Sequence, residues 1–267
     1  MKEIQKIYVD KNDVETYIDY TKNMGVYATV SETAQDSLMY ISAEKMYMDG
    51  KNTEALTKFD NYINKFKNGA FLLNANYYKA ECNMSLKQTD EALKSYDFVI
   101  AQPKNKFTEN ALLKSARIHY DKGNYEKTLA NYTQLEKLSE LRANVQEALI
   151  GKMNCNYKLE KFDDAIKSAI SVLLVDKLPD ENFRQAHFIL AKSYLEKNEI
   201  QSATEEFELL SQDCKNAEGA EAKFRLIEIY FNNKDYDKSE KEIFDFVKLN
   251  SSHQYWLAKS FLVLSDI

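Results

Sequence analysis

The chain has 267 residues, and 44% of them are hydrophobic, which excludes wholesale disorder. Only two prolines and six glycines interrupt it, so an all-β sandwich, which needs many turns, is disfavoured. The formal charge of −6 is spread along the chain with no basic face, and no apolar run reaches about 18 residues. We therefore expect neither nucleic-acid binding nor a transmembrane segment.

The first segment with helical periodicity, residues 7–17, reads like the end of one helix, a turn and the following helix. The periodicity lapses over residues 24–31, where we expect an irregular connection. The start of the chain lacks the apolar stretch of a secretion signal.

Six repeated units follow, and a small residue at the centre of each returns every 36 to 38 positions. These residues are Ala55, Ala92, Thr128, Ala165, Ala203 and Ser239. A small or apolar residue precedes each by twelve positions: Ala43, Ala80, Ala116, Met153, Ala191 and Ile227. Such a period is typical of a solenoid of helical hairpins, in which each unit packs mainly on its neighbours. Both sets are expected to be buried where paired helices approach closely.

Residues 109–140 form the clearest unit. Apolar or small residues recur there at three and four steps, as in a helix, until Gly123 and Asn124. Glycine ends a helix readily because it enters the left-handed conformation without a Cβ clash. A second periodic segment follows at once, so the two helices are predicted to be antiparallel.

The last segment, residues 255–264, reads like the first helix of a unit without its partner. Both ends of the chain are therefore apolar partial repeats, whereas a finished array usually closes with a polar capping helix. We expect a single solenoid domain over residues 1–267 that is a piece of a longer array.

On these residues the chain resembles the tetratricopeptide repeat (TPR) family, and residues 123–128 and 234–239 match its turn and second helix most closely. The family's early tryptophan is absent from all six units, and the period exceeds the usual 34 residues. Units of this length resemble those of bacterial cell-envelope assembly proteins. The resemblance implies an all-α, right-handed α-α superhelix of about six antiparallel hairpins, with partial repeats at both ends.

No signature of catalysis or of cofactor binding was found. The chain lacks a phosphate-binding loop, a His-Glu-x-x-His pair and a Gly-x-Ser-x-Gly turn. The three cysteines are too far apart for a disulfide framework or a zinc module, and are expected to be apolar filler: Cys82, Cys155 and Cys214. The three histidines are scattered over different units: His119, His187 and His253. We expect a protein that is not an enzyme and holds no metal or cofactor.

The TPR resemblance implies that first helices line a concave face where ligands lie. Helical phase places there the candidate partner-binding residues Tyr40, Tyr47, Tyr77, Glu81, Met84, Asn110, Arg117, Tyr120, Asn154, Tyr157, Phe188, Lys192, Phe224, Glu228 and Phe231. Tyrosine anchors among alternating charges suit an extended peptide or a partner helix. The alternative is that these aromatic residues only pack against the adjoining first helix.

The leading hypothesis is a non-catalytic scaffold that binds a partner protein or extended peptide. The alternative is a structural spacer of a large cell-envelope repeat protein, self-associating through its terminal partial repeats. A carbohydrate binder or enzyme is disfavoured because no pair of carboxylates converges. The compartment is the cell envelope or periplasm if the parent protein carries a signal peptide, and otherwise the cytoplasm.

Overall fold

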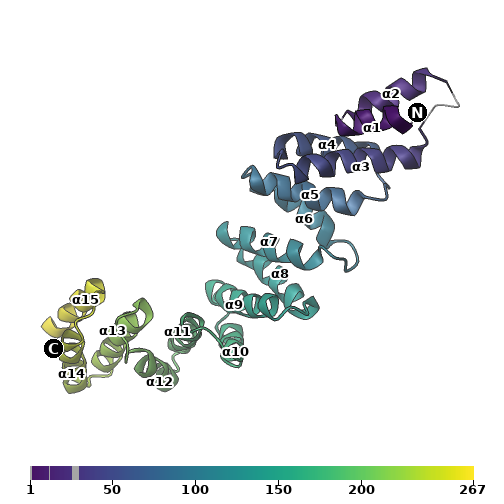
Figure 1. Cartoon of the computed structure of the whole chain (residues 1–267). Helices are drawn as coiled ribbons and strands as arrows, with labels where there is room; N and C mark the ends of the chain where they lie inside the picture. The colour runs from purple at the N-terminus through teal and green to yellow at the C-terminus, as the bar shows by residue number, and fades with distance from the viewer. Residues whose placement is uncertain (1, 12, 26–29) are drawn as a thin grey trace. The chain divides into compact units, whose positions relative to one another are not determined.

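The computed structural model describes residues 2–11, 13–25 and 30–267, and every regular element among them is an α-helix (Figure 1). The helices form two compact units, and the boundary between them falls within α7, between Ile118 and His119. A single solenoid domain over residues 1–267 stays a prediction.

The first unit holds two short helices and two complete hairpins. Its helices are α1 (Lys2–Asp10), α2 (Val14–Asn23), α3 (Glu32–Met48), α4 (Asn52–Lys65), α5 (Leu72–Ser85), α6 (Thr89–Ile100) and most of α7 (Thr108–Asp121). The predicted helix–turn–helix at residues 7–17 corresponds to α1 and α2. Half of the predicted irregular connection over residues 24–31, namely residues 26–29, lies outside the described residues.

The second unit continues the alternation of first and second helices. Its further helices are α8 (Tyr125–Leu138), α9 (Arg142–Lys158), α10 (Phe162–Leu173), α11 (Asp180–Glu196), α12 (Ile200–Leu210), α13 (Ala217–Asn232), α14 (Tyr236–Lys248) and α15 (Gln254–Ser265). Figure 1 shows α9, α11, α13 and α15 in one layer and α10, α12 and α14 in another. Helix α15 packs on α13 and α14 as the predicted first helix of a further unit.

The repeat register is confirmed, because all twelve residues that define it are completely buried. This holds for both the second-helix set that begins at Ala55 and the first-helix set that begins at Ala43. The side chain four places after each second-helix residue is buried too, and in four units it is aromatic: Phe59, Tyr96, Tyr132 and Phe207. Small residues thus let the paired helices approach, and large ones fill the space toward the next hairpin.

Each of the six hairpin turns ends its first helix in the same way. The residue five places before the buried second-helix residue has a positive φ, from 57° at Glu160 to 74° at Gly50. Its N–H binds the carbonyl three residues back, and the next N–H binds the carbonyl five residues back, as at Gly123 and Asn124. This pair of hydrogen bonds is the Schellman motif. Two of the six turns use a glycine, Gly50 and Gly123, and Lys87, Glu160, Asn198 and Lys234 take the same conformation.

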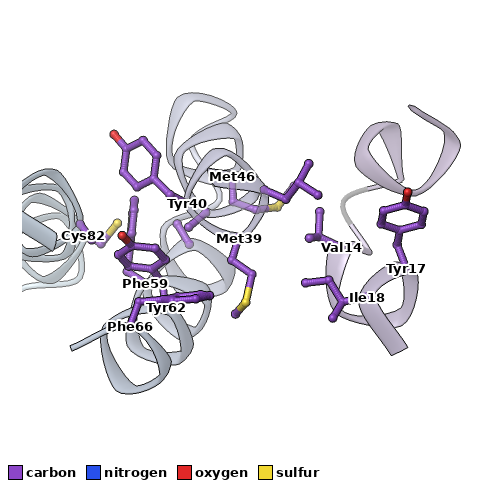
Figure 2. Close-up of a cluster of buried hydrophobic side chains, with 14 residues drawn as sticks. Val14, Tyr17, Ile18, Met39, Tyr40, Met46, Phe59, Tyr62, Phe66 and Cys82 are labelled. Atoms are coloured by element: carbon purple, nitrogen blue, oxygen red, sulfur yellow. The ribbon is translucent and has the colours of Figure 1, made fainter. Parts of the chain in front are cut away.

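The core is a series of clusters between successive helices rather than one central core, as expected for repeats. Figure 2 shows the first cluster, which runs from Val14, Tyr17 and Ile18 of α2 through side chains of α3 and α4 to Cys82 of α5. All three cysteines are buried and free, as predicted for apolar filler. His119 is buried as well.

Candidate partner-binding groove

In the first unit, two of the predicted binding residues are packed within the chain. Tyr40 is 3% exposed and its ring stacks on Phe71 at 4.5 Å between centroids. Tyr77 is 8% exposed and stacks on Phe107 at 4.2 Å. Phe71 and Phe107 each directly precede the first helix of the next repeat, so both tyrosines join neighbouring repeats. The alternative of aromatic packing describes these two positions.

Glu81 of α5 is also engaged inside the first unit. Its carboxylate accepts a hydrogen bond of 2.6 Å from the Tyr96 hydroxyl and pairs with Lys114 Nζ at 2.5 Å. Burial and this carboxylate raise the pKa of Tyr96, so the hydroxyl stays protonated and donates. Glu81 therefore joins α5, α6 and α7.

The remaining predicted residues of the first unit are more accessible. Tyr47 is half-buried, with its ring 4.9 Å from that of Tyr78, and Met84 is half-buried beside the second hydrophobic cluster. Asn110 and Arg117 of α7 are exposed. These four side chains line neither the pocket beside Met39 nor the pocket beside Asp36.

In the second unit an open cavity of about 320 Å³ lies along the first helices. Five predicted binding residues line it: Tyr120, Asn154, Tyr157, Phe188 and Lys192. The other lining residues are Lys158, Gln185, Ile189, Ala217, Glu218, Glu221 and Trp256. We call this set the groove. It brings together residues up to 136 positions apart, from Tyr120 of α7 to Trp256 of α15, because successive first helices pack side by side.

Lys192 is the central cation of the groove. Its Nζ lies 5.4 Å from the ring centroid of Tyr157 and 5.0 Å from that of Phe188, within range for cation–π attraction. The nearest carboxylate oxygen, Glu221 Oε1, is 3.7 Å away, which is an ion pair but beyond hydrogen-bonding distance. Glu221 also pairs with Arg225 at 3.3 Å. The ammonium group thus lies between two aromatic rings and the carboxylate of Glu221, which it shares with Arg225.

Trp256 forms the wall of the groove at α15. Its ring stacks on buried Phe224 with 5.4 Å between centroids, and Lys259 Nζ lies 5.5 Å from its centroid. Sequence reasoning missed Trp256 because helical phase was applied only to units with a recognisable second helix. Applying the same helical phase to α15, the first helix of the last repeat, would have pointed to Trp256.

Two further residues of the groove could have been found from the sequence. Gln185 and Glu221 each lie three positions before a predicted aromatic residue, Phe188 and Phe224, and therefore on the same helical face one turn earlier. The prediction began that face one turn too late on both α11 and α13.

Three predicted residues of α13 lie outside the lining of the groove. Phe224 is buried beneath Trp256, and Glu228 pairs with Arg225 at 2.8 Å. The ring of Phe231 lies 5.6 Å from that of Tyr236, the first residue of α14. Aromatic pairs join the ends of a first and a second helix in the same way at Tyr120–Tyr125 and Tyr157–Phe162.

Comparison with protein families agrees with this geometry. The family model for the tetratricopeptide repeat matches residues 188–245, which cover the second half of α11, all of α12 and α13, and most of α14. This segment is a tetratricopeptide repeat. The six caps and twelve buried register positions extend the TPR pattern beyond the matched residues.

Solved structures share the TPR fold at low sequence identity. YrrB, described as a TPR protein with an unusual peptide-binding site, is 16% identical with a TM-score of 0.52. The match covers 75% of this chain and 96% of YrrB. The C-terminal part of a TPR repeat-containing protein from Cytophaga hutchinsonii is 14% identical with a TM-score of 0.58, covering 96% and 98%. A structure of Naa15/Naa10 bound to HypK-THB is 14% identical with a TM-score of 0.62, and the match covers 98% of this chain and 38% of that longer chain. Comparison with curated proteins gave no match.

No set of three His, Cys, Asp or Glu side chains among the described residues is grouped so that it could hold a metal ion. None of the helices over these residues combines the length and the hydropathy that a membrane crossing requires.

Proposed function

We propose that this TPR protein is a non-catalytic interaction scaffold, and that a partner protein or extended peptide binds along the groove of the second unit. The observation that carries the proposal is the convergence of Tyr120, Asn154, Tyr157, Phe188 and Lys192 on one cavity with the unpredicted Trp256. Partly exposed aromatic side chains with polar neighbours are the common anchors of protein interfaces.

The amides of the groove support an extended ligand. The side-chain amides of Asn154 and Gln185 form no hydrogen bond within the described residues, although both line the cavity. A primary amide both donates and accepts, so each can pair with one N–H and one carbonyl of a peptide backbone. The structural relatives are in keeping with this use, since YrrB has a peptide-binding site and Naa15/Naa10 is bound to HypK-THB.

The test is site-specific photo-cross-linking in the parent cell. A benzoyl-phenylalanine at Asn154 or Tyr157 should cross-link a partner, and one at Lys167, which is exposed on α10, should not. Cross-links from Lys167 alone would contradict binding in the groove.

A matched pair of variants separates binding from packing. Tyr157→Ala removes a partly exposed ring and should weaken partner capture with little change in melting temperature. Tyr77→Ala removes a ring that is 8% exposed and should lower stability by about 3 to 5 kcal/mol, without a direct effect on the groove. Equal capture by wild type and Tyr157→Ala would count against the proposal.

The exposed face of α15 supports the alternative function, a structural segment that self-associates. Tyr255 is 64% exposed and Leu262 67%, and Phe261 lies beside them with 45%. A spacer in a large cell-envelope array would bury such a face against another helix. Sedimentation velocity over a concentration series tests this: association that Leu262→Glu abolishes would favour it, and a monomer at all concentrations would oppose it.

A further inference from the structure

We propose that the groove selects an acidic segment of its partner, in which a carboxylate takes the ammonium group of Lys192 in place of Glu221. An apolar side chain next to that carboxylate would lie against Phe188 and Trp256. This inference rests on the proposed function and adds the chemistry of the ligand.

The first argument is that the donors of Lys192 are underused. No acceptor lies within hydrogen-bonding distance of Nζ among the described residues, and Glu221 at 3.7 Å is its nearest carboxylate. A ligand carboxylate placed at 2.7–2.9 Å would form the charge-assisted hydrogen bond that Glu221 does not reach.

The second argument is that Glu221 can give up Lys192 without being left unpaired. Its carboxylate is held by Arg225 at 3.3 Å, and Arg225 also pairs with Glu228 at 2.8 Å. The ligand therefore replaces one carboxylate by another at Lys192. No buried charge is left without a partner, and it is such an unpaired charge that makes the breaking of an ion pair cost free energy.

The third argument is the local pairing of charges. The groove lining carries two cations, Lys158 and Lys192, and two carboxylates, Glu218 and Glu221. Glu218 pairs with Arg184 and Glu221 with Arg225, so each lining carboxylate has a cation outside the lining, and Lys259 adds a further cation beside Trp256. These surrounding cations would steer an acidic segment toward Lys192.

The fourth argument disfavours a basic ligand. The aromatic faces that would attract a ligand cation already carry the protein's own cations. Lys192 lies over Tyr157 and Phe188, while Arg225 and Lys259 lie within 5.9 Å and 5.5 Å of the Trp256 centroid. A lysine or arginine of the partner would have to displace them against like-charge repulsion.

The experiment uses four fluorescent decapeptides of Gly and Ser that each carry two Phe and three variable residues. The variable residues are Glu, Gln or Lys, with both termini blocked, and the fourth peptide is the Gln peptide with a free C-terminal carboxylate. Fluorescence anisotropy with the full chain at low and moderate salt measures affinity. We expect the Glu peptide to bind at least about tenfold more tightly than the blocked Gln peptide and the Lys peptide to bind most weakly.

Three variants at partly exposed side chains test the proposal by the direction in which the affinity for the Glu peptide changes. Lys192→Gln should abolish the preference for Glu over Gln. Glu221→Gln should strengthen binding of the Glu peptide, because it removes the internal competitor. Glu228→Gln is the matched control, since it removes the same charge and also contacts Arg225 but lies outside the groove lining, and its gain should be smaller. Unchanged thermal melts establish that each variant is folded.

Several outcomes would overturn the inference. These are equal binding of the Glu and Gln peptides, tighter binding of the Lys peptide, or a preference that survives Lys192→Gln. If the free C-terminus restores binding to the Gln peptide, a carboxylate is still the ligand and its source is the chain end. If partner cross-links map to the groove but the Glu peptide has no advantage, the acidic ligand is refuted and the scaffold function stands. If cross-links avoid the groove, both fail.

Discussion

The ring of Tyr132 in α8 lies directly against the backbone of Gly151 in α9. A Cβ atom at position 151 would overlap three atoms of that ring. Gly151 therefore has a packing role, since it lets a second helix deliver its aromatic side chain to the next first helix. It is the counterpart of the small residues that define the repeat.

Gly151→Ala should lower stability, although the same change in an open helix would raise it by about 1 kcal/mol. The overlap with Tyr132 should cost about 1–3 kcal/mol and reverse the sign. Chemical denaturation measures the change. In a Tyr132→Leu background the alanine should be harmless, and an equal loss in both backgrounds would contradict the packing role.

Ala92→Glu or Ala203→Glu should destabilise a repeat by at least about 3 kcal/mol. Each alanine is completely buried between helices, so the longer side chain is overpacked and its charge has no partner. Ala130→Glu is the control, because Ala130 is exposed on α8. Thermal unfolding followed by far-UV circular dichroism should separate the two kinds of variant, and normal melting of both buried variants would refute the repeat register.

The six hairpin turns predict opposite effects of glycine and alanine. Gly123→Ala should lower stability by about 1 kcal/mol, because Gly123 has a φ of 73° that a Cβ atom disfavours. Glu160→Gly relieves that strain at a φ of 57° and should leave stability unchanged or raise it by up to about 1 kcal/mol. A loss of stability for Glu160→Gly, measured by urea unfolding, would contradict this account of the turn.

The buried thiols predict a loss of stability at alkaline pH. Burial raises the pKa of Cys82 and of Cys155 to about 12, and that of Cys214 to about 11, whereas an unfolded thiol titrates near 8.5. The unfolded chain therefore releases these protons first. The stabilising contribution is complete below about pH 8.5 and is lost as the pH rises toward 11 to 12.

Thiol labelling checks the same property directly. In the native protein at pH 8 a thiol reagent should label the three cysteines slowly, and in urea all three rapidly. Replacing all three with alanine should reduce the alkaline loss of stability measured between pH 8.5 and 11. Rapid labelling of the native protein would show that these thiols are accessible.

Much of the architecture could be predicted from the sequence because hairpin contacts are local and repeat at a fixed period. The buried positions from Ala43 to Ser239, the turns and the last helix all follow from side-chain size and helical phase. The left-handed conformation of Lys87, Glu160, Asn198 and Lys234 was not predicted, because it is imposed by the two helices that each turn joins rather than by a glycine.

The sequence by itself determined that small side chains must meet at set intervals along stacked helix pairs, since that depends only on periodicity and on side-chain volume. Tertiary structure alone decided which aromatic residues remain accessible. Tyr40 and Tyr77 share the helical phase of Phe188, yet stacking on Phe71 and Phe107 buries them, while Phe188 lines a cavity with Trp256. Whether a ring faces a ligand or a neighbouring ring depends on residues from the following repeat, and the phase of a single helix contains no information about them.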